Sequence, residues 1–113
     1  MIKHVGLKEL IEELELMPPD GVIRYAFGRP RSYRGHYEDL AFEPVAIAAV
    51  ADMLKHAKSA LGATFEGYKG GDFVMEEYTS CWIAEYGSSA GDKIGMTIIN
   101  LWRDQLGLEQ RHD

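Results

Sequence analysis

The sequence predicts an α+β fold, in which a small, mostly antiparallel sheet carries two helices packed on one face. Two segments repeat apolar residues at the spacing of a helix, and several shorter ones are rich in β-branched and aromatic residues, as strands are. The length of 113 residues, with 46% apolar and 27% charged residues, suits a single globular domain over residues 1–113. We expect residues 103–113 to form a C-terminal tail.

The first helix is expected from Leu7 to Met17, where apolar residues recur three and four positions apart among glutamates. Pro18 and Pro19 end it, because proline cannot continue a helix. Residues 22–27 then predict a strand. In a strand Val22, Arg24 and Ala26 point to one side, and the side chains between them, including Tyr25, point to the other.

The middle of the chain is expected to be less regular. Gly28, Pro30 and Gly35 predict a loop over residues 28–37. A short strand over residues 40–42 follows and ends before Pro44. Residues 45–61 predict the second helix, and Gly62 is suited to the position just after its end.

The second half of the chain predicts a run of strands. Residues 63–68 and 73–75 are expected to form a hairpin around Gly70 and Gly71. Residues 79–86 alternate as a strand does. Residues 94–102 are β-branched and apolar, which favours a final strand, with a helix reaching Leu106 as the alternative.

The distribution of charge is the strongest functional signal. The chain has a net charge of −6, yet residues 21–37 contain no acidic residue and hold four of the six arginines. Arginine offers a planar set of donors that matches phosphate, tyrosine offers a flat face, and glycine admits a ligand close to the backbone. This stretch therefore predicts a site for a small anion. The alternative is that the arginines pair with the chain's own carboxylates, such as Glu38, Asp39, Glu43, Glu76 and Glu77.

Two segments supply the candidate ligand-binding residues. Arginines would neutralise phosphate, tyrosines would stack or donate, and the segment GYKGGD would contribute a lysine, although it lacks the spacing of a P-loop and favours a plain hairpin turn. The candidates are Arg29, Arg31, Ser32, Tyr33, Arg34, Gly35, His36, Tyr37, Tyr68, Lys69 and Gly70. Trp82, Tyr86 and Trp102 favour packing over base stacking.

Several other functions are not expected. The only cysteine, Cys81, favours a buried thiol, and the four histidines lack metal-ligand spacing, so we predict no metal and no cofactor. No apolar run is long enough for a membrane span, and the acidic balance disfavours duplex nucleic acid. With no signal peptide, the expected location is the cytoplasm. Catalysis is not favoured, because only His36 lies within the arginine-rich stretch and no nucleophile or paired acid accompanies it.

Three blocks of the sequence resemble a family of small uncharacterised proteins of phages and bacterial genomes. The blocks are SYRGHYEDLAFEP (residues 32–44), ALGATFEGYKGGDFVM (60–75) and TSCWIAEYG (79–87), and the similarity spans about residues 21–87. His36 stands where tyrosine is common in that family. The resemblance implies a phage context, and with it a location in the host cytosol.

A small acidic phage protein of this kind would act as a counter-defence factor. We expect it to bind a phosphorylated small molecule without converting it, such as a cyclic or ADP-ribose-derived nucleotide signal of bacterial immunity. Such a sponge is expected to be a homo-oligomer, a dimer or higher. Two alternatives are an inhibitor that binds a host defence enzyme, and a nucleotide hydrolase or lyase that uses His36.

Overall fold

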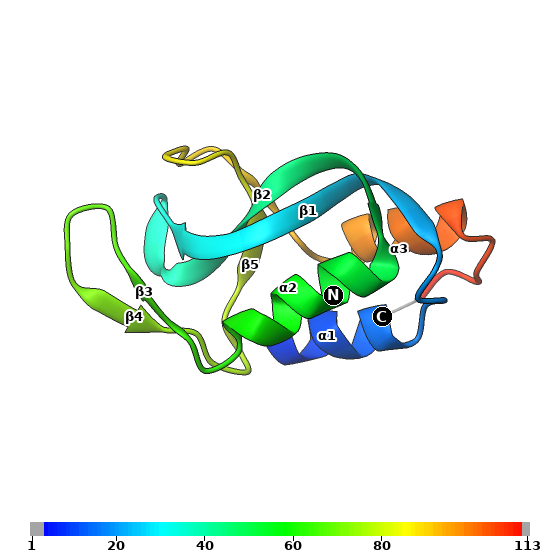
Figure 1. Cartoon of the computed structure of the whole chain (residues 1–113), viewed down its shortest axis with the longest axis horizontal. Coiled ribbons are helices and arrows are strands. Elements are labelled where there is room, and N and C mark those ends of the chain that lie inside the picture. Colours follow the sequence, from blue (N-terminus) through cyan, green and yellow to red (C-terminus); the bar gives the residue numbers. More distant parts are fainter. Residues whose placement is uncertain (1–3, 112–113) are drawn as a thin grey trace.

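A ribbon of two long antiparallel strands forms the centre of the fold (Figure 1). A computed structural model describes residues 4–111. β1 (Val22–Tyr33) and β2 (His36–Ala49) are joined by a turn at Arg34 and Gly35. The predicted loop over residues 28–37 is therefore wrong, because those residues form the end of a hairpin. The second strand is also much longer than the predicted residues 40–42.

The sheet is mixed, with the strand order β1-β2-β5-β6. β5 (Cys81–Ile83) lies parallel to β2 along residues 40–42, and β6 (Asp92–Lys93) lies antiparallel to β5. A separate hairpin of β3 (Thr64–Glu66) and β4 (Asp72–Val74) extends from one end of the molecule. The α+β class and the hairpin are confirmed, and one strand pairing is parallel.

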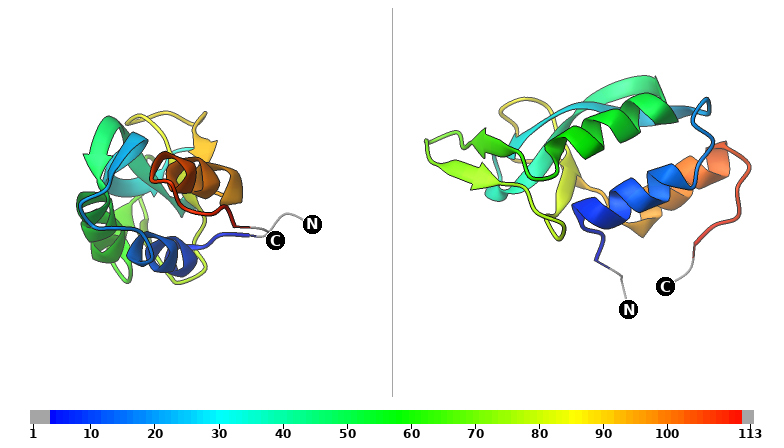
Figure 2. Two further views of the ribbon diagram at one scale, coloured as in Figure 1. Left: turned by 90° about the vertical axis from the view of Figure 1, so that its right-hand side faces the viewer. Right: turned by 60° about the horizontal axis from the view of Figure 1, so that its bottom comes forward.

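Three helices, rather than the predicted two, pack on the sheet. α1 (Leu7–Glu15) lies beside α2 (Val50–Ala60), and α3 (Met96–Gln105) lies on the other side of α1 (Figure 2). α2 begins five residues later than predicted, because residues 45–49 pair with β1 instead. Gly62 follows the helix end with φ +79°, as expected of a residue in that position.

The predicted final strand over residues 94–102 is wrong, and the helical alternative is what forms. Ile99 and Trp102 lie three positions apart and are both fully buried, so one face of α3 packs on the core. The tail predicted from residue 103 is also wrong in part, because α3 continues to Gln105. Residues 112–113 of that tail lie outside the described residues.

α3 is held against the outer edge of β1. The side-chain amide of Gln105 accepts a hydrogen bond from the backbone N–H of Arg24 at 2.6 Å and donates one to its carbonyl at 3.0 Å. Trp102 Nε1 donates to the carbonyl of Tyr25 at 2.9 Å. Tyr25 has φ +59° and is partly exposed, so the prediction that it shares a face with the buried Ile23 and Phe27 is wrong.

The two faces of the sheet are packed differently. The main core lies between the helices and the face that carries Leu40 and Phe42, where Phe42 stacks on Phe27 with ring centroids 4.0 Å apart. A second, smaller cluster of Tyr33, Ala41, Ala84 and Trp82 lies on the opposite face. Among residues 4–111 no helix has the length and apolar character to cross a bilayer.

Candidate functional site

A small pocket lies where the turn of the β1–β2 hairpin meets the β3–β4 hairpin and the segment after β5. Its volume is about 80 Å³. We call it the Arg31–Arg34 pocket. Its lining residues are Arg31, Ser32, Arg34, Glu66, Tyr68, Tyr86 and Gly87. Two segments that the sequence singled out, 28–37 and 67–72, therefore both contribute to one concave site.

Arg31 forms the partly buried wall of the pocket. Its Nη2 donates a hydrogen bond to the carbonyl of Ala84, and its guanidinium carbon lies 5.4 Å from the centroid of the Tyr86 ring. Burial lowers the pKa of Arg31 from its ordinary value, while the charges of Glu43 and Tyr86 act in the opposite direction. A cation that has lost part of its hydration favours a bound anion.

Arg34 forms the exposed wall, from the turn between β1 and β2. Its Nη1 donates to the carbonyl of Gly87 at 2.7 Å, and its guanidinium carbon lies 3.9 Å from the centroid of the Tyr68 ring. Stacking on an aromatic ring leaves the edge of a guanidinium available for further hydrogen bonds. The contact also joins the β1–β2 hairpin to the β3–β4 hairpin.

Within residues 4–111, neither of these arginines forms an ion pair with a carboxylate. The ion pairs of this part of the chain join Lys58 to Glu15, and Arg103 and Arg111 to Glu13. Arg31 and Arg34 therefore do not form the ion pairs of the alternative derived from the sequence, although the charge of Glu43 acts on Arg31. Their contacts with protein are backbone carbonyls and tyrosine rings.

Three other candidates have structural partners nearby. Ser32 lines the pocket, but its hydroxyl donates to the carbonyl of Tyr37 at 2.8 Å. Tyr33 is buried and stacks on Trp82 with ring centroids 4.5 Å apart. Gly35 lies against the Tyr33 ring, because a Cβ on it would be 2.5 Å from Tyr33 Cε2. The contacts of Tyr33 belong to the cluster on the second face of the sheet.

The remaining candidates do not line the Arg31–Arg34 pocket. Arg29 and His36 are exposed on the two strands, while Lys69 and Gly70 are exposed in the β3–β4 turn. Tyr37 packs against Phe73, with ring centroids 5.9 Å apart, and so helps to fix the β3–β4 hairpin.

Sequence reasoning does not select three residues that line the pocket: Glu66, Tyr86 and Gly87. The sequence favours a packing role for Tyr86, but its ring is 85% exposed. Tyr86 and Gly87 lie at the end of the alternating residues of a predicted strand, and functional residues often lie at that position. Glu66 has no comparable signal, since only the β3–β4 pairing brings it here.

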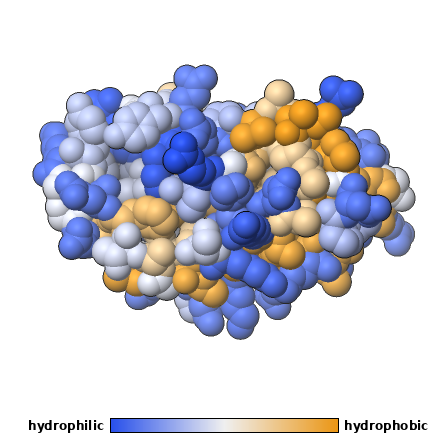
Figure 3. All heavy atoms as spheres, viewed as in Figure 1, coloured by the Kyte–Doolittle hydropathy of each residue, from blue (hydrophilic) through white to orange (hydrophobic). Residues whose placement is uncertain are grey.

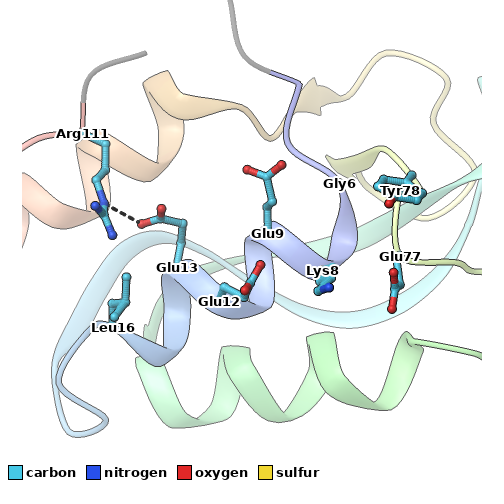
Figure 4. A pocket seen from close by; sticks show the side chains of 9 residues that line it. All are labelled: Gly6, Lys8, Glu9, Glu12, Glu13, Leu16, Glu77, Tyr78 and Arg111. Atoms are coloured by element: carbon cyan, nitrogen blue, oxygen red, sulfur yellow. Dashed lines mark hydrogen bonds and ion pairs between the residues drawn. The ribbon is translucent and has the colours of Figure 1, made fainter.

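Two larger grooves are acidic and do not suit an anion. One, of about 530 Å³, runs along α1 and is lined by Glu9, Glu12, Glu13 and Glu77, with Lys8 and Arg111 beside them (Figure 4). The other, also about 530 Å³, is lined by four carboxylates and by no lysine or arginine. A negatively charged ligand is repelled from such surfaces.

The described part of the chain contains no cluster of metal-ligating side chains, and its one thiol is buried. Residues 4–111 contain no cluster of three or more histidine, cysteine, aspartate or glutamate side chains placed to hold a metal ion. Cys81 is buried in β5, and burial raises the pKa of its thiol well above the ordinary value. A thiol in that environment stays protonated and unreactive.

The fold and the pocket define an α+β protein with a small site of arginines and tyrosines. No family model, no curated protein and no solved structure matches the chain.

Proposed function

We propose that this protein binds a phosphorylated small molecule in the Arg31–Arg34 pocket and does not convert it. The observation that carries the proposal is the position of two arginines that form no ion pair with a carboxylate among residues 4–111, in one concave site within a chain of net charge −6. One carboxylate, that of Glu66, also lines the site. A guanidinium has five N–H donors, and charge-assisted hydrogen bonds to phosphate are the strongest that such a group makes.

The size of the pocket favours one phosphate group rather than a whole nucleotide. About 80 Å³ holds several water molecules, which is comparable to a tetrahedral anion. The rest of the ligand would lie over the rim, where Tyr68 is 62% exposed and Tyr86 is 85% exposed. Each ring has an arginine on one face and can accept a base on the other.

The proposed ligand is a nucleotide signal, which the protein sequesters without converting it. This part rests on the resemblance of residues 32–44, 60–75 and 79–87 to small phage and bacterial proteins, and on a pocket suited to phosphate and an aromatic ring. Binding without conversion is favoured because His36, the histidine nearest in sequence to the arginines, does not line the pocket.

Isothermal titration against a panel of phosphorylated ligands tests the proposal. The panel contains inorganic phosphate, pyrophosphate, AMP, ADP-ribose and a cyclic dinucleotide. We expect the nucleotides to bind more tightly than phosphate, because stacking of the base on Tyr68 or Tyr86 adds to the attraction between the arginines and the phosphate. The absence of heat with every member of the panel would overturn the proposal.

Replacing Arg34 identifies the site. Arg34→Ala should weaken binding of the best ligand about 10- to 100-fold, the usual cost of one charge-assisted hydrogen bond. Arg29→Ala is the matched control, since it removes the same charge from an exposed position of β1 that does not line the pocket. Equal losses in the two variants would mean that the effect is one of general charge.

Recovery of the ligand separates a sponge from an enzyme. The protein is incubated with the ligand and then heat-denatured, and the released ligand is analysed by chromatography. We expect it to be returned intact. A converted product that disappears in His36→Ala would support the hydrolase or lyase alternative instead.

A further inference from the structure

One edge of the central ribbon is left open. β5 borders β2 only along residues 40–42, so within residues 4–111 no strand lies beside β2 from Val45 to Ala49. We call this segment the open edge of β2. A strand edge of this kind presents unpaired backbone N–H and C=O groups that another strand can pair with.

The direction of those backbone groups follows from the contacts of β1. Arg24 pairs with Ile47 across the ribbon, and both backbone groups of Arg24 are bonded to Gln105 on the far side of β1. In an antiparallel pair, two facing residues turn their N–H and C=O groups either both toward each other or both away. Ile47 therefore directs its N–H and C=O outward, to the open edge of β2.

The two edges of the ribbon differ in what covers them. At the level of Arg24 and Tyr25, the outer edge of β1 is covered by Gln105 and Trp102 of α3. The open edge of β2 consists of uncharged residues and contains no proline, and Pro44 precedes it in the chain. Edges that stay exposed are normally protected by charges, prolines or bulges along their length.

The side chains at this edge are apolar and exposed. Ile47 is 50% exposed, and Val22 on the neighbouring strand is 54% exposed. Figure 3 shows an apolar patch over the β2 side of the ribbon, besides smaller apolar areas elsewhere on this face. Residues 44–50 contain no charge, so two copies of this acidic chain can approach here without facing carboxylates.

We infer that the open edge of β2 pairs with the same edge of a second copy of this chain. The two strands run antiparallel about a two-fold axis at Ile47, which joins the two sheets into one. In this register Ile47 lies opposite the partner's Ile47, and Val45 lies opposite the partner's Ala49. Such a contact is self-complementary, as a two-fold interface requires. The Arg31–Arg34 pocket lies toward the turn at the other end of the ribbon and stays open.

The mass of the protein in solution tests this inference. Light scattering after size-exclusion chromatography should give about twice the chain mass of 12.7 kDa. Ile47→Lys should give the mass of one chain, because it places two ammonium groups opposite each other at the axis. Val74→Lys is the matched control, with 54% exposure in β4 away from this edge, and should leave the dimer intact. Circular dichroism confirms that both variants are folded.

A cross-link tests the register. Directly opposed residues in a hydrogen-bonded antiparallel pair have Cα atoms about 5.5 Å apart, which is within the range of a disulfide. Ile47→Cys should therefore form a covalent dimer under mild oxidation, while Val74→Cys stays largely monomeric on a denaturing gel. A monomeric parent protein, a dimer that survives Ile47→Lys, or an Ile47→Cys dimer that does not cross-link would each overturn the inference.

Discussion

The candidate ligand-binding residues divide between those that line the Arg31–Arg34 pocket and those that pack in the fold, and residue type alone does not separate them. Tyr33 and Tyr68 look equivalent in the sequence, but Tyr33 is buried on Trp82 whereas Tyr68 lies in the pocket under Arg34. The difference arises from strand alternation, because Tyr33 points to the face that also carries Ala41 and Ala84. A predicted loop over residues 28–37 has no such alternation, so the sequence could not show that Tyr33 is buried.

Gly35 is expected to be required for the packing of Tyr33. Gly35→Ala places a methyl group 2.5 Å from the Tyr33 ring, so the ring has to shift and its stacking on Trp82 is disturbed. We expect the free energy of unfolding to fall by about 1–3 kcal/mol, as overpacked sites do. Urea denaturation measures it, and His36→Ala, at the next and exposed position, should change it by less than about 0.5 kcal/mol. Equal stability of the two variants would contradict this packing role.

Tyr25 is expected to make stability depend on alkaline pH. Burial, the hydrogen bond to Asp92 and the charge of Asp92 together raise the pKa of Tyr25 from 10.0 to about 12. The folded protein then holds this proton more tightly than the unfolded chain does. The stabilisation is complete below pH 10 and is lost as the pH rises through about 12.

Two variants check this pH dependence. Tyr25→Phe should remove that part of the alkaline loss of stability. Asp92→Asn should lower the pKa of Tyr25 without returning it to 10.0, since burial is the largest cause of the increase. Ultraviolet titration of the phenols follows the transition directly. A titration curve of the Asp92→Asn variant that matches the parent protein would contradict the assignment.

At the level of elements, the sequence predicts the first two helices and the β3–β4 hairpin, but not the helix over residues 96–105 or the length of β1 and β2. The first helix and the β3–β4 hairpin were evident from apolar spacing and from paired glycines. The long strands were missed because Pro30 and Pro44 indicate breaks. Both prolines lie within the ribbon beside a register shift between Phe27 and Pro30, and prolines are tolerated at such irregularities and on strand edges.

The contact of α3 with β1 is expected to contribute measurably to stability. Gln105→Ala removes two hydrogen bonds to the backbone of Arg24 and uncovers the outer edge of β1. We expect a loss of about 1–2 kcal/mol in the free energy of unfolding. Asp104→Ala, its exposed neighbour on the same helix, should change stability by less than about 0.5 kcal/mol. Thermal and urea unfolding of the two variants provide the comparison.

For the whole molecule, the α+β class followed from the sequence because local periodicity determines it. The parallel pairing of β2 with β5 did not, since it depends on which distant strands meet and leaves no local pattern. The same limit applies to the site. The concentration of arginine pointed to residues 28–37, but only the assembled fold selects Arg31 and Arg34 and adds Tyr86 and Glu66.

The contact between the last helix and the first strand also bears on how the chain folds. Arg24 and Gln105 are 81 positions apart, and Tyr25 and Trp102 are 77 apart, while β5 has to reach β2 past the whole of α2 and the β3–β4 hairpin. Bringing such distant segments together costs chain entropy before the stabilising contacts have formed. We therefore expect folding to take roughly milliseconds to seconds. During synthesis β1 and β2 leave the ribosome before α3 does, so the outer edge of β1 stays uncovered until Trp102 and Gln105 have emerged.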